Sequence, residues 1–184
     1  CRWDRRYEVR AIDSAGKVVN DGNVCFQNTH SFSPIVFDMT GSGMIETLNP
    51  ILSSTYFDLD ANGRVEKTGW IKRGSALLSL NLNHNGKVDN GRELFGEATK
   101  VANGATAENG YIAMEQYDSN HDGVIDSKDQ VFGDLKLWFD ANSDGVSQSH
   151  ELISLKAAGI TSISVKYNKH ACASNKSFPS SYSS

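Results

Sequence analysis

The chain has 184 residues, of which 39% are hydrophobic, and it carries 18 Lys and Arg against 22 Asp and Glu. This near balance differs from the strongly basic composition of nucleic-acid-binding proteins, so we expect no nucleic-acid partner. No apolar run approaches the roughly 20 residues that span a bilayer, so we expect no transmembrane segment. The length fits one domain, with enough apolar residues to bury a core.

The acidic residues are concentrated in one part of the chain. Eight acids and only two lysines lie between Tyr117 and Glu151, which gives this window a net charge of −6. The remainder of the chain carries a net charge of +2. Carboxylates this close in sequence repel one another unless a cation neutralises them.

The first predicted element is a β-hairpin over residues 9–19, which turns around Ser14-Ala15-Gly16. Further elements are indicated by hydrophobic periodicity and by glycine stop signals. They are a short helix over 109–117, a strand or short helix over 135–139, a helix over 151–158 that stops at Gly159, and a strand over 160–165.

Four segments repeat one pattern, in which an apolar residue precedes Asp or Asn at alternate positions and a glycine follows at the sixth position. Numbered from the first Asp or Asn, these loops begin at residues 58, 81, 118 and 140. The gaps of 23, 37 and 22 residues divide them into two pairs, which indicates a duplication.

This spacing is typical of a loop that binds a hard cation. Ca²⁺ takes about 6–8 oxygen ligands, supplied by loop positions one, three and five, a carbonyl at seven and a carboxylate near twelve. Glycine at the sixth position permits the sharp bend. Nitrogen and sulfur ligands are absent from these positions, which argues against zinc and copper. We therefore expect Ca²⁺ in two sites, and in up to four.

The two later loops have the more complete ligand sets. Asp129 and Glu151 are the carboxylates at their twelfth positions. Ile125, at the eighth position of the loop at 118, is expected to pair with a neighbouring loop. At the eighth position of the loop at 140, Ser147 replaces the usual apolar residue. The candidate ligands, with 124 and 146 acting through their carbonyls, are Asp118, Asn120, Asp122, Val124, Asp126, Asp129, Asp140, Asn142, Asp144, Val146 and Glu151.

The two earlier loops depart further from the pattern. In the second loop three Asn replace carboxylates, and Glu93 stands one place beyond the twelfth position. In the first, Gly69 occupies the twelfth position, so a ligand must come from elsewhere. A fifth segment, 38–43, resembles a decayed copy and is predicted to be a turn. The candidate ligands are Asp58, Asp60, Asn62, Arg64, Asn81, Asn83, Asn85, Lys87, Asp89 and Glu93.

These patterns predict an α+β fold in which EF-hand-like calcium loops, in two pairs, are joined by short helices and small β-hairpins. We expect residues 1–32 to be an N-terminal β-rich segment or the end of a preceding domain, 33–168 to be the calcium-binding module, and 169–184 to be a flexible Ser-rich tail. Three cysteines, Cys1, Cys25 and Cys172, leave their pairing open.

A series of short motifs follows Pro34 in a specific order. They include Pro34-Ile35-Val36-Phe37-Asp38, Tyr56-Phe57-Asp58, Thr68-Gly69-Trp70, Glu93-Leu94-Phe95-Gly96 and Leu137-Trp138-Phe139-Asp140. Over about 135 residues this order resembles a calcium-binding module of bacterial RTX-type secreted proteins. The resemblance implies a bacterial protein that is secreted or displayed at the cell surface, with calcium and a protein partner or parent polypeptide as partners.

The best-known modules of this kind are the self-processing modules of iron-regulated RTX proteins. The resemblance implies that calcium folds the module, which then cleaves an Asp-Pro bond at its own N-terminus and can join the new aspartyl end to a lysine. Here Ser33 precedes Pro34, and no Asp-Pro occurs in the chain. We therefore predict a secreted calcium-binding module without catalytic residues, and keep calcium-triggered self-processing as an alternative.

A dockerin-like interaction module is a third hypothesis, because the last two loops begin 22 residues apart. A dockerin needs a helix of about ten residues after both loops. Residues 130–138 are interrupted by Gly133 and end in an alternating pattern, which counts against this hypothesis.

Overall fold

The computed structural model describes residues 5–26, 34–43, 45–166 and 170–171. Strands dominate these residues, together with one short α-helix and three 3-10 helices. The strands are β1 (Arg5–Asp13), β2 (Val18–Phe26), β3 (Val36–Asp38), β4 (Thr47–Leu48), β5 (Tyr56–Phe57), β6 (Glu66–Lys67), β7 (Trp70–Ile71), β8 (Ser75–Leu80), β9 (Val124–Asp126), β10 (Leu135–Trp138), β11 (Leu152–Ser154), β12 (Ile160–Ser164) and β13 (His170–Ala171). The helices are α1 (Gly110–Glu115), η1 (Gly91–Glu93), η2 (Gln130–Gly133) and η3 (Ser149–Glu151).

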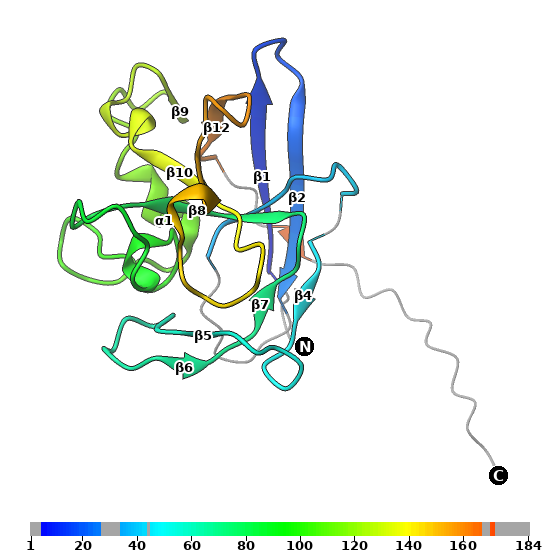
Figure 1. The fold of residues 1–184 in the computed structure, drawn as a ribbon. Coiled ribbons are helices and arrows are strands. Elements are labelled where there is room, and N and C mark those ends of the chain that lie inside the picture. Colours follow the sequence, from blue (N-terminus) through cyan, green and yellow to red (C-terminus); the bar gives the residue numbers. More distant parts are fainter. Residues whose placement is uncertain (1–4, 27–33, 44, 167–169, 172–184) are drawn as a thin grey trace.

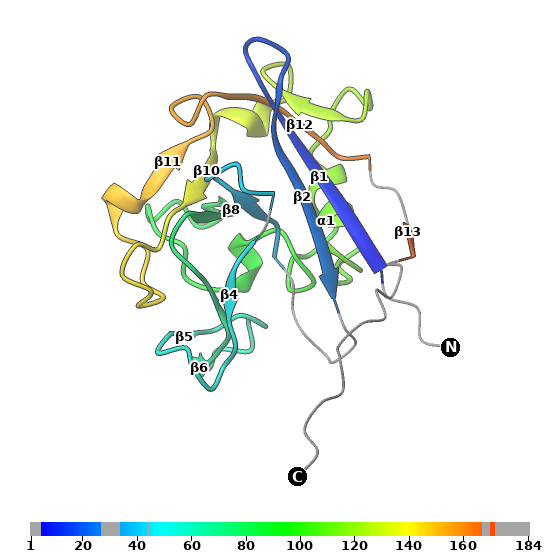
Figure 2. The same cartoon turned by 90° about the vertical axis from the view of Figure 1, so that its right-hand side faces the viewer.

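The first sheet is built around the long strand β1, which pairs with β2 along one edge. On its other edge, β1 pairs with β12 near its end and with β13 near its beginning. Strand β9 completes the order β13-β1-β12-β9, and every pairing is antiparallel. The long β1–β2 hairpin stands out in Figures 1 and 2.

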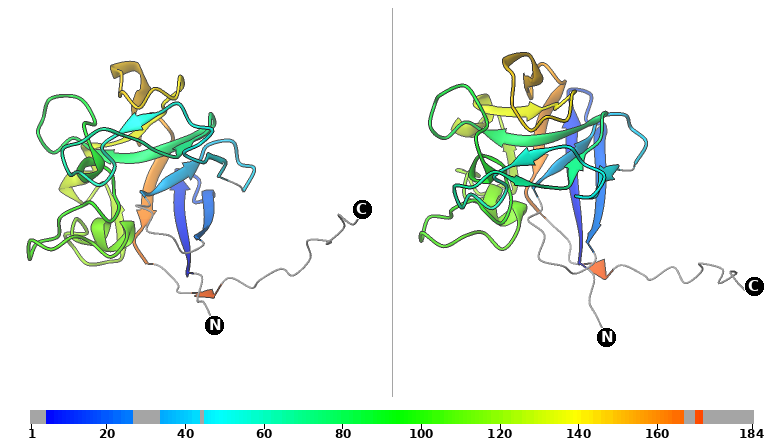
Figure 3. Two further views of the ribbon diagram at one scale, coloured as in Figure 1. Left: turned by 90° about the horizontal axis from the view of Figure 1, so that it is seen from below. Right: turned by 60° about the horizontal axis from the view of Figure 1, so that its bottom comes forward.

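The second sheet has the order β11-β10-β8-β3, also antiparallel. Its strands run across the direction of the β1–β2 hairpin (Figure 3). All six residues of β8 are buried, because this central strand is covered on both faces. Two short ribbons, β4–β7 and β5–β6, contribute Phe57, Trp70 and Ile71 to a hydrophobic cluster that they share with residues of this sheet.

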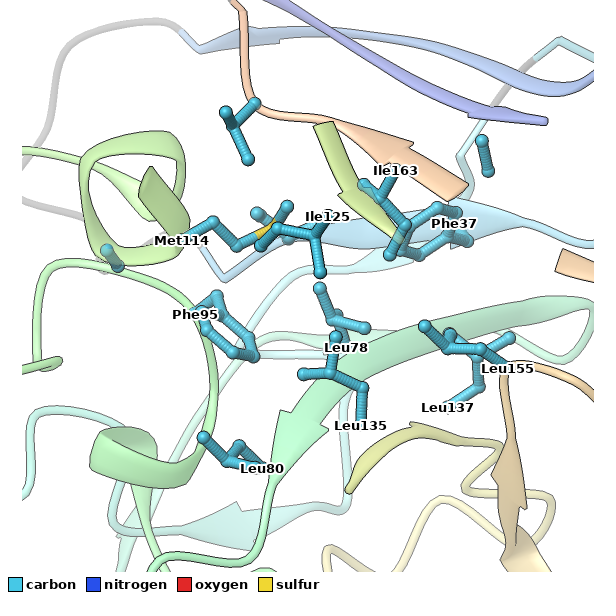
Figure 4. Close-up of a cluster of buried hydrophobic side chains, with 14 of the residues drawn as sticks. Phe37, Leu78, Leu80, Phe95, Met114, Ile125, Leu135, Leu137, Leu155 and Ile163 are labelled. Carbon is cyan, nitrogen blue, oxygen red and sulfur yellow. The ribbon is translucent and has the colours of Figure 1, made fainter. Parts of the chain in front are cut away.

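Alternate residues of the second sheet contribute to two hydrophobic clusters. Leu78 and Leu137 belong to the larger cluster, whereas their neighbours Leu77 and Trp138 belong to a smaller, aromatic cluster. In the larger cluster, side chains from both sheets and from α1 converge (Figure 4). The labelled members are Phe37, Leu78, Leu80, Phe95, Met114, Ile125, Leu135, Leu137, Leu155 and Ile163.

The predicted α+β fold with helices between the loops is wrong for the described residues. The helix predicted over 151–158 does not form, because Leu152–Ser154 pairs with β10 at the edge of the second sheet. Only one helical turn follows, with the Ala158 N–H donating to the Ser154 carbonyl, before Gly159 adopts a positive φ. The available sheet edge therefore outweighs local helix propensity.

Several other predicted elements are confirmed. The hairpin over 9–19 is the tip of β1 and β2, and the segments 135–139 and 160–165 contain β10 and β12. The helix predicted over 109–117 is α1, whose N-cap Asn109 accepts hydrogen bonds from two backbone N–H groups. Cys1, Cys172 and nearly all of the predicted tail lie outside the described residues. Among the described residues, no helix has the length and apolar character needed to cross a membrane.

Gly91 lies where η1 contacts the loop that begins at residue 58. Its N–H donates to the Asp58 carbonyl at 2.9 Å, and an added Cβ would overlap the carbonyl of Leu59. We expect Gly91→Ala to lower the free energy of unfolding by about 1–3 kcal/mol through this backbone clash. Urea unfolding measures the change, with Gly133→Ala as the control because a Cβ there meets nothing within 4 Å. Equal stability of the two variants would contradict the prediction.

Asp38 ends β3 and closes the turn over 38–43. Burial raises the pKa of Asp38, but hydrogen bonds from Thr40, Ser42 and the Gly43 N–H outweigh it and lower the pKa to about 2.

A lowered carboxyl pKa stabilises the fold above about pH 4, and this stabilisation is lost as the pH falls towards 2. We expect Asp38→Asn to cost about 2 kcal/mol of unfolding free energy at pH 7. The difference in unfolding free energy between the wild type and this variant should narrow as the pH falls from about 4 to 2. Urea unfolding with a calcium chelator present measures it. A gap that does not change with pH would contradict this assignment.

Candidate calcium loops

The four predicted loops have the same local backbone. Residues at the fourth position adopt a left-handed conformation, with φ between 57° and 59°, and the glycines at the sixth position have φ between 73° and 88°. Among the described residues, no other non-glycine residue has a positive φ. Left-handed backbone is unfavourable for residues with a Cβ, so its recurrence shows a shared geometric requirement. These residues are Ala61, His84, His121 and Ser143, followed by Gly63, Gly86, Gly123 and Gly145.

Side-chain oxygens at alternate positions accept hydrogen bonds from N–H groups within the same loop. The first carboxylate accepts the N–H of the sixth-position glycine at 2.9 Å in Asp58, 2.7 Å in Asp118 and 2.9 Å in Asp140. The fifth-position oxygen accepts the N–H of the seventh residue in all four loops, at 2.8–3.0 Å. These bonds hold the acidic and amide side chains against their own loop.

Three of the loops are closed by a carboxylate that reaches back to the second position. Glu151 Oε1 accepts the Ala141 N–H at 2.9 Å, and Asp129 Oδ1 accepts the Ser119 N–H at 2.9 Å. Glu93, one place later in its loop, makes the same contact with the Leu82 N–H at 2.9 Å. In each case the other oxygen accepts the N–H of the ninth residue. The loop at 81 therefore accommodates its one extra residue before the closing carboxylate.

The predicted ligands differ in burial according to their position. Positions three, five and seven are half-buried or exposed, whereas the first carboxylates and the closing carboxylates lie beneath the surface. Ionised carboxylates are rarely buried without a partner, so these are the positions where a cation would stabilise the fold most. The buried residues are Asp58, Glu93, Asp118, Asp129, Asp140 and Glu151.

The loop at 140–151 brings two carboxylates into the protein interior. Asp140 and Glu151 are both 3% exposed, and each accepts an indole N–H as well as backbone N–H groups. Burial raises the pKa of Asp140, and the like charge of Glu151 raises it further, against the opposing effect of its hydrogen bonds. The two buried negative charges favour any cation that binds between them.

The loop at 118–129 contains a carboxylate oxygen without a partner. Asp118 Oδ1 is buried and has no hydrogen-bond partner among the described residues. At the surface of this loop, Lys128 pairs with Asp122 at 3.4 Å and with Asp126 at 3.2 Å. Burial of Asp129 acts to raise its pKa, but hydrogen bonds from Asp126 and Ser119 lower it overall, which favours the ionised form.

The two earlier loops offer fewer carboxylates. In the loop that begins at Asn81, the exposed Asp89 accepts the side-chain N–H groups of Asn83 at 2.8 Å and Asn85 at 2.6 Å. In the loop that begins at Asp58, Glu66 is exposed in β6 and does not close the loop. Whether these two loops bind a cation therefore stays a prediction.

The loops are not paired as the sequence spacing predicted. Ser147, at the eighth position of the last loop, accepts the Val88 N–H at 2.7 Å and contacts the Val88 carbonyl at 3.3 Å. Val88 is the eighth residue of the loop at 81, so these two loops meet through equivalent positions. Ile125 instead lies opposite Ile163 in β12. The predicted pairing of the last two loops is therefore wrong, because the eighth residue of the loop at 118 pairs with β12 and that of the loop at 140 meets the loop at 81.

The segment 38–43 repeats the loop backbone more fully than its sequence indicated. Gly41 and Gly43, at the fourth and sixth positions, have φ of 73° and 75°, and Asp38 accepts the Gly43 N–H at 2.7 Å. The predicted turn is confirmed. The sequence signal for the shared backbone is the glycine at position four, which permits the left-handed conformation without a Cβ.

The donor chemistry of the two later loops fits a hard cation. Their predicted ligands are all oxygens, and the unpartnered Asp118 Oδ1 is a buried oxygen that a cation would satisfy. Within the described ranges, no three His, Cys, Asp or Glu side chains are gathered into a ready-made metal cluster. Part of each predicted donor set consists instead of Asn amide and backbone carbonyl oxygens.

Comparison with known proteins places the chain in a family. Iron-regulated protein FrpA of Neisseria meningitidis serogroup C is 39% identical to it over 138 residues, which is 75% of this chain. The matched region is 12% of the length of FrpA. This similarity confirms the predicted relation to modules of iron-regulated proteins. Residues 35–183 match the SPM domain, and this chain belongs to the SPM domain family.

Proposed function

We propose that this chain is a calcium-binding module of a secreted or cell-surface bacterial protein, whose fold is completed by Ca²⁺. The loops at 118 and 140 are the two principal sites, and those at 81 and 58 are further sites, up to four in all. The observation that carries the proposal is the loop backbone common to all four segments, with left-handed fourth and sixth positions.

The proposed sites use the oxygens whose positions were described above. Side-chain oxygens at positions one, three and five, the carbonyls of Val124 and Val146, and the closing carboxylates Asp129 and Glu151 would hold the ion. When bound, Ca²⁺ supplies two positive charges to each group of buried carboxylates and removes their mutual repulsion. Calcium here acts on folding, and no chemical step is assigned to it.

Mass action makes this effect large enough to control folding. Extracellular calcium modules bind at roughly 10⁻⁴–10⁻³ M. At a free concentration ten times Kd, each site adds about 1.4 kcal/mol to stability. Two to four such sites matter against total stabilities of about 5–15 kcal/mol. In a compartment with little free calcium the carboxylates of the acidic window would repel one another. Outside the cell, bound Ca²⁺ would neutralise them.

The relation to FrpA supports a bacterial origin and a place within a longer polypeptide, because the matched region is a small part of that protein. We propose residues 33–168 as the module, with 1–32 as an N-terminal β-rich segment or the end of a preceding domain and 169–184 as a tail. The partners are calcium and the parent polypeptide or another protein.

Calcium-triggered self-processing is the second candidate function, and the similarity to an iron-regulated protein favours it, because the sequence resembles the self-processing modules of such proteins. The sequence opposes it, because Ser33 stands before Pro34 and supplies no carboxylate to attack the bond. Ser33 lies outside the described residues, whereas Ile35 is fixed by a hydrogen bond to the Phe95 carbonyl. A dockerin-like role is disfavoured because η2 and η3, which follow or end the last two loops, are each only one short turn.

Calcium binding is tested by calorimetric titration together with circular dichroism. We expect the wild type to bind Ca²⁺ in the millimolar range or tighter, with a rise in ordered structure. Asp118→Ala and Asp140→Ala should each lose one site and weaken the structural response. Asp134→Ala is the matched control, because it removes an exposed acid of the same window that is not a predicted ligand.

The absence of calcium binding by the wild type in the millimolar range would overturn the proposal. Loss of binding in Asp134→Ala equal to that in Asp140→Ala would also contradict it, because net charge rather than loop geometry would then account for the affinity.

Self-processing is tested on a denaturing gel after incubation of the chain with millimolar Ca²⁺. We expect the wild type to stay intact with and without calcium, because the dipeptide before Pro34 is Ser-Pro. Calcium-dependent fragments or crosslinked species of the wild type would favour the second candidate function. Ser33→Asp, which restores an Asp-Pro bond, tests whether the remainder of the chain supports cleavage.

A further inference from the structure

A tight aromatic cluster lies beneath the loop that begins at residue 140. Phe57, Trp70 and Trp138 come from β5, β7 and β10, and each ring is almost completely buried. The three pairs of ring centroids are 5.3, 5.5 and 5.4 Å apart, and the rings are tilted or edge-on. These distances are those of favourable aromatic contacts, so the rings are fixed by one another.

Both tryptophans point their only polar atom at a carboxylate of this loop. Trp70 Nε1 donates to Asp140 Oδ2 at 2.6 Å, and Trp138 Nε1 donates to Glu151 Oε2 at 3.3 Å. Asp140 is the first residue of the loop, and Glu151 is its closing carboxylate. An indole N–H is a donor only, so a buried indole of this kind fixes both the position of the carboxylate and its role as acceptor.

The two carboxylate oxygens of Asp140 differ in their hydrogen bonds. Oδ2 accepts from Trp70 and from the Gly145 N–H, whereas Oδ1 receives only a longer bond, at 3.2 Å, from the Asp144 N–H. The carboxylate is therefore held mainly through Oδ2, whereas Oδ1 is hydrogen-bonded more weakly. Groups that orient a ligand in this way tune metal affinity without touching the metal.

We propose that Trp70 and Trp138 are positioning residues for the calcium site at 140–151, which hold its first and closing carboxylates in place through their indole N–H groups. The inference rests on the proposed function. It also assigns the aromatic cluster a role beyond packing, because the same two rings that fill the smaller core orient the two most buried carboxylates of the loop.

The role is tested by measuring Ca²⁺ affinity in Trp70→Phe and Trp138→Phe, which retain an aromatic ring and remove the N–H. Loss of an orienting partner typically costs about 10–100-fold in metal affinity, and we expect this loss at the site that Asp140→Asn also weakens. In the double variant Trp70→Phe/Asp140→Asn, removal of the indole should have little further effect on that site.

Phe57→Leu is the matched control for packing. It disturbs the same cluster but leaves both indole N–H groups, so we expect lower stability with affinity changed less than threefold. A second measurement retains both tryptophans and follows the indole ¹H–¹⁵N resonances by NMR during a Ca²⁺ titration of the wild type and of Asp140→Asn. We expect the Trp70 and Trp138 resonances to shift with occupancy of the site and Asp140→Asn to remove the Trp70 shift.

The two hypotheses fail in different ways. A wild type that binds no Ca²⁺ overturns the proposed function. A wild type that binds Ca²⁺ while Trp70→Phe and Trp138→Phe retain its affinity, or while the two indole resonances do not move, overturns the positioning role alone. The NMR titration decides the question even when a Trp variant does not fold.

Discussion

The structure depends on a single electrostatic constraint, which is that buried carboxylates need partners. Asp38, Asp58, Asp118, Asp140 and Glu151 are all buried, and each accepts backbone N–H groups from its own tight loop. Left-handed backbone at the fourth and sixth positions makes those N–H groups available, and this explains why the same strained conformation recurs where glycine is absent. The strands between the loops are correspondingly short, because the chain turns again after a few residues.

The sequence predicted the local features well and the long-range ones poorly. Loop positions, the short helix over 109–117 and the strand over 160–165 follow from spacing and periodicity, which are properties of neighbouring residues. The helix expected after Glu151 does not form, because this segment pairs with the edge strand β10. A pairing with a distant strand leaves no pattern in the local sequence.

The spacing of the loops in the sequence also did not predict which loops contact each other. The regular gaps indicate a duplicated pair, yet the Ser147 hydroxyl joins the last loop to Val88 of the second loop. Ser147 occupies the position where an apolar residue is usual, and that departure was the available signal for an unusual partner. The two tryptophans are a similar case. Their hydrophobic character predicts the core, whereas the direction of their N–H groups follows only from the packed structure.

The pairing of β1 with both β12 and β13 joins the two ends of the described fold. Arg5, at the start of the first strand, lies opposite Ala171, at the end of the last. The first and the last described strands are therefore hydrogen-bonded neighbours in one sheet. Each of them covers part of an edge that would otherwise present unpaired backbone groups. The sheet is thus completed only when the last described strand is in place, so its cooperativity extends over the whole described chain.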